Sequence, residues 1–208
     1  LAKTKILGAV TVQTGIELFE TLRWTPREGF SRLDRHLQRM RSSAEFFGVP
    51  MNLTCAHRAL DQAIVGDPDL CLRVRLSLDM QGEFRVESRE LPERLSPDEA
   101  QPIRLTVSPI DSSDLYLRHK TSHREVYDQA VAEVPDGVEP ILFNERGEIT
   151  ESAIANVVYR VGEDWFTPPV ASGLLPGTLR EELVEQGKLT PRVLRVEELE
   201  SVAEVALV

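Results

Sequence analysis

The chain has 208 residues, of which 41% are hydrophobic and 28% are charged, and its formal net charge is −10. This composition is ordinary for a globular protein, and the acidic balance argues against a nucleic-acid binder or a polybasic membrane anchor. No apolar run approaches the ~20 residues of a membrane span. The two cysteines, Cys55 and Cys71, form neither a CxxC pair nor a zinc-ligand set. We therefore expect no metal site, and we expect a reducing cytoplasmic location.

The first half of the chain begins with strand and helix patterns. Residues 15–24 are rich in strand formers, and "TPREG" after them predicts a hairpin turn. An amphipathic helix is predicted over 31–48, and a weaker helix over 53–65. The first helix ends at "GVP" and carries apolar residues at steps of four and three, namely Leu33, Leu37, Met40, Ala44 and Phe47.

Alternating apolar residues then predict three further strands. The first covers 70–80, its partner covers 83–91 across the turn "MQGE", and the third covers 102–110. The proline- and acid-rich stretch 91–102 predicts a loop or a crossing between two lobes. The first half is thus expected to be an α+β module, with an antiparallel sheet and helices on one side.

The second half resumes with strands. Residues 140–169 predict three strands, joined by tight turns at Glu145–Gly147 and Gly162–Asp164. A helix is predicted over 178–188, and the remaining residues mix a strand with a short helix.

One candidate anion site is the start of the helix at 178. Thr178 and Glu181 fit a capping box, and Pro176 and Gly177 precede it. A glycine here lets the backbone turn sharply and leaves the first N–H groups free, so the helix start could seat a phosphate group. The alternative is a plain strand-to-helix loop.

Lys120 is a candidate for chemistry. Ser122 and Glu125 form a second capping box, which predicts that a helix begins just after Lys120. The positive end of that helix would disfavour the protonated amine and make it a better nucleophile toward carbonyls. The alternative is an ordinary surface lysine.

Three carboxylates, those of Glu145, Glu148 and Glu151, surround a predicted turn and strand. Alternating carboxylates usually mark a solvated edge. Glu151, however, leads into a run of small uncharged residues, 152–155, followed by Asn156. This pattern favours a Glu151 side chain that faces a pocket.

Four stretches, "RHLQRMRSSAEFFG", "HKTSHREVY", "NERGEITESAIANVVY" and "TPPVASGLLPGTLREEL", occur in the order seen in class IV (fold-type IV) pyridoxal-phosphate enzymes. The chain resembles this family from about residue 15 to 190. The resemblance implies a two-domain α+β fold, with a small N-terminal α/β domain over 1–112 and a larger β-barrel-like, cofactor-binding domain over 113–208. The polar segment that usually ends the family is absent after "EVALV", so a truncated C-terminal end is expected.

The resemblance also implies pyridoxal 5′-phosphate as the cofactor and roles for individual residues. Lys120 matches the lysine that binds the cofactor covalently and later moves protons at the substrate. Glu151 matches the carboxylate that faces the pyridine nitrogen and keeps it protonated. Arg39 matches the arginine that grips the phosphate with its planar guanidinium group.

Five further positions complete the implied site. Thr178 and Leu179 match the positions whose backbone N–H groups complete the phosphate cup. Asn156 matches a position of structural role close to the site. Arg124 and Tyr127 are candidates for binding the cofactor hydroxyl or the substrate carboxylate.

Within the family, "ELFETLRW", "LDRHLQRMRSSAEFFGVP" and "HKTSHREVYDQA" look most like the aminodeoxychorismate lyase type. The resemblance extends to the lyase-like domain fused to aminodeoxychorismate synthase component I, and "LAKTKIL" resembles the seam of such a fusion. The implied reaction eliminates pyruvate from 4-amino-4-deoxychorismate and yields 4-aminobenzoate, a folate precursor. Lys120 would be the general base.

Two other functions remain open at the level of sequence. One is a class IV aminotransferase acting on branched-chain or D-amino acids, which needs a keto acid for its second half-reaction. The other is a non-catalytic domain of the same fold that supports a synthase partner. The family resemblance also implies a homodimer with the site near the subunit interface.

Overall fold

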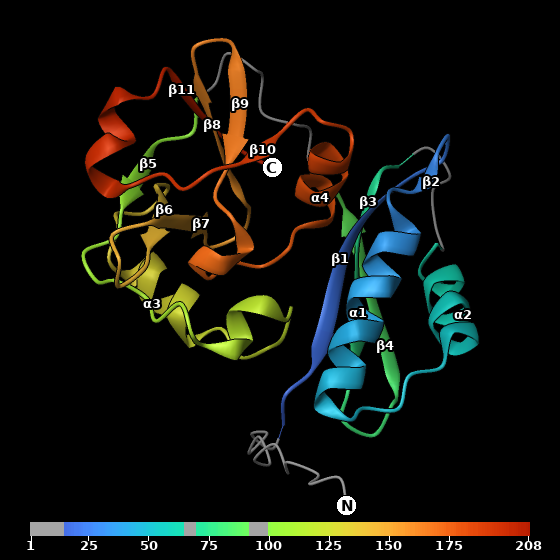
Figure 1. Cartoon of the computed structure of the whole chain (residues 1–208). Helices are drawn as coiled ribbons and strands as arrows, with labels where there is room; N and C mark the ends of the chain where they lie inside the picture. The colour runs from blue at the N-terminus through green and yellow to red at the C-terminus, as the bar shows by residue number, and fades with distance from the viewer. Residues whose placement is uncertain (1–14, 65–69, 92–99) are drawn as a thin grey trace, which may run out of the picture.

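The computed structural model describes residues 15–64, 70–91 and 100–208, which form an α+β fold with three sheets. Figure 1 shows one sheet and its two helices beside the two sheets and the remaining helices of the second half. The α+β class agrees with the prediction from sequence. The expected fusion seam at 1–7 and most of the loop expected at 91–102 lie outside the described residues.

The first half consists of β1 (Leu18–Thr25), β2 (Gly29–Phe30), α1 (Leu33–Phe47), α2 (Leu53–Ala63), β3 (Leu72–Leu78) and β4 (Phe84–Glu90). Its sheet has the order β2-β1-β3-β4, and all neighbouring strands are antiparallel. The hairpin after residue 24, both helices and the paired strands were predicted correctly.

The core of this half lies between α1 and the sheet. The apolar stripe of α1, including Leu37, Met40 and Ala44, is buried against Leu18 and Leu22 of β1. Each buried leucine or methionine contributes about 1.5–3 kcal/mol relative to an exposed one. This packing fixes α1 against β1, and both elements border the cavity described below.

The second half forms the sheets β5-β6-β7 and β10-β9-β8-β11. An isolated bridge between Glu151 and Asn156 joins the end of β7 to the start of β8. In the described part of the chain the two sheets do not close into one barrel.

The elements of the second half, in chain order, are β5 (Ile103–Leu105), η1 (Leu115–Arg118), α3 (Glu125–Ala132), β6 (Glu139–Phe143), β7 (Ile149–Ser152), β8 (Val157–Val161), β9 (Asp164–Thr167), η2 (Val170–Ser172), α4 (Thr178–Glu185), β10 (Thr190–Pro191), η3 (Val196–Ser201) and β11 (Glu204–Leu207).

The segment 140–169 contains four strands, so the prediction of three was wrong. The additional turn separates β7 from β8, where the backbone N–H of Ser152 donates to the carbonyl oxygen of Ala155 at 2.9 Å. The Ser152 hydroxyl also accepts hydrogen bonds from the N–H groups of Ile154 and Ala155. The turn places Glu151 and Asn156 opposite each other.

The strand predicted over 102–110 is also shorter than expected, because β5 ends at Leu105. The N–H groups of Val107 and Ser108 donate to the carboxylate of Glu133, at 2.6 and 3.2 Å, in place of a neighbouring strand. The chain rejoins the sheet only at Ile110.

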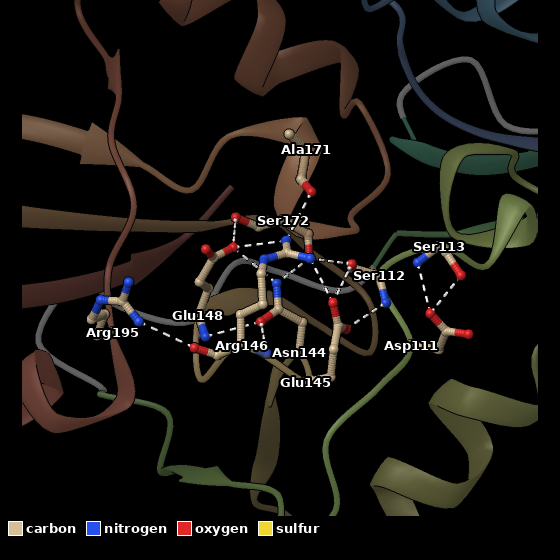
Figure 2. A network of polar contacts seen from close by, with 10 residues as sticks. All are labelled: Asp111, Ser112, Ser113, Asn144, Glu145, Arg146, Glu148, Ala171, Ser172 and Arg195. Carbon is tan, nitrogen blue, oxygen red and sulfur yellow. Dashed lines mark hydrogen bonds and ion pairs between the residues drawn. The ribbon is translucent and has the colours of Figure 1, made fainter.

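A polar network around Arg146 connects three loops of the second half (Figure 2). The guanidinium group of Arg146 donates to the Ser112 hydroxyl at 2.6 Å, to Glu148 at 2.9 Å and to the carbonyl oxygen of Ala171 at 3.1 Å. The chain after Ser112 leads to Lys120, and the chain after Ala171 leads to α4. The network therefore holds the bases of two segments that border the cavity.

Candidate active site

A cavity of about 290 Å³ lies between β1 and α1 on one side and the second half of the molecule on the other. This volume is near the lower end for small-molecule sites. Residues from β1, α1, the segment 119–124, α3, the β7–β8 turn and the start of α4 line the cavity. All eight residues proposed from the sequence are among them, namely Arg39, Lys120, Arg124, Tyr127, Glu151, Asn156, Thr178 and Leu179.

Lys120 lies on a short extended segment beside β1. Its carbonyl oxygen accepts a hydrogen bond from the N–H of Phe19 at 3.0 Å, and the N–H of Ser122 donates to the carbonyl oxygen of Glu17 at 2.8 Å. The Nζ atom lies 4.9 Å from the centroid of the Phe19 ring. Main-chain bonds thus fix the position from which the amine enters the cavity.

The predicted capping box after Lys120 is wrong. Helix α3 begins at Glu125, and its N-cap, Arg124, makes no side-chain cap hydrogen bond. The hydroxyl of Ser122 instead accepts a hydrogen bond from the N–H of Glu17 at 2.9 Å. The Ser122 hydroxyl therefore binds the chain before β1 and does not cap the helix. This contact joins distant parts of the chain, so the residue spacing within 118–130 does not reveal it.

The pKa of Lys120 is nevertheless lowered, to about 8. Burial is the main cause, and the positive charges of Arg39 and Arg124 add to it, while Glu20 and Glu151 act in the opposite direction. The expected direction was right, but burial rather than a helix end is the main cause. About half of the amines are neutral at pH 8, and the neutral amine is the nucleophilic form.

Glu151 is a buried carboxylate at the end of β7, with 4% of its surface exposed. Its Oε1 accepts hydrogen bonds from the Tyr127 hydroxyl at 2.7 Å and the Leu175 N–H at 3.1 Å. Its Oε2 accepts one from Nδ2 of Asn156 at 3.1 Å. Burial raises the pKa of Glu151 to about 7 despite these donors. The group can therefore hold either a proton or a charge near neutral pH.

Asn156 connects Glu151 to the chain before α4. Its Nδ2 also donates to the carbonyl oxygen of Leu175 at 2.9 Å. A Cβ atom at Gly177 would lie only 1.9 Å from Oδ1 of Asn156, so any side chain here would displace the Asn156 amide or the backbone. Gly177 therefore allows the start of α4 to approach the amide of Asn156, a reason for this glycine that the sequence did not reveal.

The start of α4 has the features of an anion site, although the predicted capping box is wrong here too. The N-cap is Gly177, and Thr178 is the first helical residue. Among the described residues, the backbone N–H groups of Thr178 and Leu179 have no hydrogen-bond partner. Free N–H groups at the positive end of a helix are a common seat for phosphate.

Arg39 points to this helix start from α1. Its Nε and one terminal nitrogen donate to the two oxygens of Glu20 at 2.9 and 2.6 Å, and the other terminal nitrogen donates to the carbonyl oxygen of Pro176 at 2.9 Å. The planar pair of donors expected for a phosphate is thus taken by Glu20. Within the described residues, two of the five guanidinium N–H groups remain for a ligand.

Arg124 and Tyr127 make hydrogen bonds within the protein, and the contacts expected of them with a cofactor hydroxyl or a substrate carboxylate stay predictions. The Tyr127 hydroxyl donates to Glu151, and burial raises the pKa of Tyr127 well above its ordinary value. Arg124 donates to the carbonyl oxygen of Ala153 at 2.8 Å, and its guanidinium carbon lies 4.7 Å from the centroid of the Tyr127 ring. Both side chains support the Glu151 side of the cavity.

Two buried residues at the cavity were missed by the sequence analysis: His36, which lines it, and Glu20, which lies behind it. Glu20 is 1% exposed and lies between Leu18 and Leu22 on the inward face of β1. His36 is 6% exposed and lies in the apolar stripe of α1. A charged residue at an inward position of an alternating strand was the signal that could have revealed Glu20.

The cavity is strongly basic although the protein is acidic. Among the described residues that line it, Glu151 has the only side-chain carboxylate, whereas five are cationic, namely Arg23, Arg32, Arg39, Lys120 and Arg124. The other two carboxylates expected near Glu151, those of Glu145 and Glu148, instead bind Arg146 in the network of Figure 2. Such a lining favours anionic ligands.

These donors fit pyridoxal 5′-phosphate. The cavity offers an amine of lowered pKa, a buried carboxylate and a helix start with free N–H groups beside an arginine. Within the described residues, no group of three or more His, Cys, Asp or Glu is placed to hold a metal ion. No helix in the described ranges is long and apolar enough to cross a membrane.

Comparisons with known proteins agree with this fit. The family model for amino-transferase class IV matches residues 17–208. A candidate aminodeoxychorismate lyase of Schizosaccharomyces pombe is 30% identical over 165 residues, which span 76% of this chain and 69% of the relative.

Solved structures of related chains have the same fold. A candidate amino-acid aminotransferase from Mesorhizobium loti is 35% identical with a TM-score of 0.88, and the match covers 93% of this chain and 94% of that one. A hypothetical aminotransferase from Mycobacterium tuberculosis, solved in its PLP-bound form, is 24% identical with a TM-score of 0.76, and the match covers 92% and 76% of the two chains. At this lower identity the likeness concerns the fold alone.

Proposed function

Because this chain belongs to the class IV aminotransferase family, whose enzymes depend on pyridoxal 5′-phosphate, we propose that it eliminates pyruvate from 4-amino-4-deoxychorismate. The product would be 4-aminobenzoate. The observation that carries the proposal is the meeting of Lys120, Glu151 and the start of α4 in one basic cavity.

Three parts of the cavity would hold the cofactor. Lys120 would bind it covalently through the amine, and Glu151 would face its ring nitrogen. The phosphate group would bind to Arg39 and the free N–H groups of Thr178 and Leu179. When bound, the cofactor supplies a ring that accepts electrons from the substrate.

Lys120 would also move the proton in the reaction. Its pKa of about 8 leaves a useful fraction of neutral amine at physiological pH, so the freed side chain can accept the proton from the carbon that carries the substrate amine. Loss of the neighbouring enol ether as pyruvate then makes the ring aromatic. No second substrate is needed.

The charge of the cavity supports a substrate with two carboxylates, such as aminodeoxychorismate. Arg23 and Arg32 lie on the β1 and α1 side of the cavity, and Arg124 lies on the opposite side. Two separate groups of cations can each receive one carboxylate. The name of the Schizosaccharomyces pombe relative supports the same reaction.

Amino-acid transamination is the second candidate. The observation that favours it is the likeness to the candidate amino-acid aminotransferase from Mesorhizobium loti, which is 35% identical to this chain, against 30% for the Schizosaccharomyces pombe relative. An aminotransferase would use the same lysine to move a proton, and it would then require a keto acid.

A product assay distinguishes these reactions. The purified protein, loaded with pyridoxal phosphate, is incubated with 4-amino-4-deoxychorismate, and pyruvate and 4-aminobenzoate are measured in equal amounts if the lyase proposal is correct. Amino-group transfer from branched-chain or D-amino acids to 2-oxoglutarate would indicate the aminotransferase instead. Cofactor binding with neither activity would indicate a non-catalytic domain that supports a synthase. Lys120→Ala is the control for both reactions.

We also propose that the protein is a homodimer whose interface reaches the cavity. Ile154 lines the cavity in the turn between β7 and β8 and is 73% exposed, which suits a side chain covered by a partner subunit. Light scattering should give a dimer for the unchanged protein and a monomer for Ile154→Asp. Val131→Asp is the matched control, because Val131 is 52% exposed and does not line the cavity.

A further inference from the structure

A continuous chain of buried hydrogen bonds connects Arg39 to the hydroxyl of Thr178. Arg39 binds both oxygens of Glu20, and Oε2 of Glu20 lies 2.7 Å from Nδ1 of His36. Nε2 of the same imidazole lies 3.2 Å from Oγ1 of Thr178. Glu20, His36 and Thr178 are 1%, 6% and 7% exposed, so these groups have little access to water.

The chemistry of Glu20, His36 and Thr178 determines which atom donates each hydrogen bond. Burial opposes ionisation of Glu20, but Arg39 and His36 outweigh it and hold the pKa of this carboxyl below its ordinary value. An ionised carboxylate only accepts hydrogen bonds, so Nδ1 of His36 carries the proton. In a neutral imidazole Nε2 is then an acceptor, and the Thr178 hydroxyl must donate to it.

This arrangement turns the Thr178 proton away from an anion at the start of α4. A bound phosphate group would meet the two free N–H groups and Arg39, but it would face the lone pairs of the Thr178 oxygen. The conflict disappears if His36 is protonated, because Nε2–H then donates to Oγ1 and the hydroxyl is free to donate to the phosphate.

We propose that His36 takes up one proton from solvent when a dianionic phosphate group binds at the start of α4. An N–H bond forms at Nε2, the Thr178 hydroxyl rotates, and no bond of the phosphate changes. His36 is thus a positioning residue that acts through Thr178, and Glu20 holds its ring in place. The inference rests on the proposed phosphate site of the cofactor.

The charges around His36 act in both directions, and a bound phosphate shifts the balance toward the protonated ring. Glu20 faces His36 from β1 and favours the protonated ring, whereas Arg39 and Arg32 on the same side of α1 oppose it. From α4, the first-turn N–H groups also oppose a cation at His36, and Glu182 is partly neutralised by Arg32 at 3.6 Å. A phosphate dianion adds two negative charges to this group, which favours proton uptake.

The test uses a phosphate monoester without ring or aldehyde, glycerol 2-phosphate, so that only the phosphate contact is probed. All proteins carry Lys120→Ala, because the Lys120 amine itself titrates near pH 8. Binding is measured by calorimetry at pH 7.5 to 9, where the monoester is a dianion, in two buffers of different ionisation enthalpy. We expect uptake of close to one proton at the lower pH values and, over the same values, an affinity that falls up to tenfold per pH unit.

Three variants isolate the contribution of His36. His36→Gln offers Thr178 a permanent amide donor, so the affinity should change less than twofold over the same range and the extra proton uptake should disappear. Thr178→Val removes the hydroxyl and should also remove the uptake, whereas Thr178→Ser should retain it. If His36→Gln does not fold, the variants Thr178→Val and Thr178→Ser still test the role of the hydroxyl. The nitrogen NMR signals of the His36 ring, recorded with and without the monoester, then report whether the ring is protonated on binding.

Two negative results distinguish a failure of the His36 proposal from a failure of the proposed phosphate site. Monoester binding with equal proton uptake in the unchanged and His36→Gln proteins would overturn the role of His36 and leave the phosphate site intact. No monoester binding at millimolar concentration would overturn both the relay and the phosphate site.

Discussion

The hydroxyl of Tyr127 donates a hydrogen bond of 2.7 Å to Oε1 of Glu151, the shortest of the three contacts that hold this buried carboxylate. The two residues come from α3 and β7, and both side chains line the cavity. With the pKa of Glu151 raised to about 7 by burial, each donor influences whether the carboxylate is charged.

Tyr127→Phe should weaken Glu151 as a partner for a protonated ring nitrogen. Loss of a hydrogen bond to a buried charged group costs about 1.5–3 kcal/mol, so the pKa of Glu151 should rise and kcat/KM at pH 7 should fall at least tenfold. The pH dependence of the cofactor spectrum measures the shift. Tyr116→Phe is the control, because within the described residues the Tyr116 hydroxyl makes no hydrogen bond. An unchanged pH dependence in Tyr127→Phe would contradict this role.

Gly177→Ala should displace Asn156 and, with it, the support of Glu151. The added methyl group would meet Oδ1 of Asn156 at 1.9 Å, and a clash of this size costs about 1–3 kcal/mol if the backbone moves. Thermal unfolding and cofactor affinity measure the effect. The double variant Gly177→Ala/Asn156→Ala should be no less stable than Asn156→Ala alone. Additive losses would show that Asn156 is not the group that excludes a side chain.

The reaction of Lys120 with aldehydes should report its lowered pKa. Only the neutral amine reacts, so the rate of covalent cofactor attachment should rise with pH and reach half its maximum near pH 8. Arg124→Leu removes a nearby positive charge and should move the midpoint to higher pH. Arg192→Leu should not, because Arg192 lies against Phe166 and does not line the cavity. A midpoint near 10 in the unchanged protein would refute the lowered pKa.

Glu148 should make the protein sensitive to acid. Hydrogen bonds from Arg146, Asn144 and Ser172 lower its pKa to about 2, and its side chain is 13% exposed. The stabilisation is present above the unfolded-state pKa of about 4.3 and is lost as pH falls toward 2. Its size is on the order of 2–3 kcal/mol.

Urea unfolding at pH 7 and pH 3 tests this expectation. Glu148→Gln should destabilise the protein at pH 7 and reduce the loss of stability between pH 7 and 3. Glu204→Gln is the control, because the Glu204 side chain is 52% exposed in its pair with Arg160 and should contribute less than about 1 kcal/mol. Equal effects of the two variants would contradict the assigned role of the network.

The sequence predicted the elements with strong periodicity correctly. The stripe of α1 and the alternation of β3 follow directly from burial of one face, so they could be read without any tertiary information. The eight site residues were identified by resemblance, and the structure brings all of them to one cavity. Their roles toward a cofactor remain proposals.

Three of the errors arise from contacts between distant parts of the chain. Ser122 caps no helix because it binds Glu17, and Thr178 caps no helix because its hydroxyl meets His36. Similarly, Glu133 takes the N–H groups that would have extended β5. Local patterns cannot show which distant group competes for a donor.

The central claim is that Lys120 is the covalent anchor of pyridoxal phosphate, and peptide mass spectrometry tests it most directly. The protein is mixed with the cofactor, reduced with borohydride and digested. We predict a pyridoxyl phosphate adduct on the peptide that contains Lys120, and none on that peptide in Lys120→Ala. Modification spread over other lysines at similar yield, with Lys120 unmodified, would contradict the account.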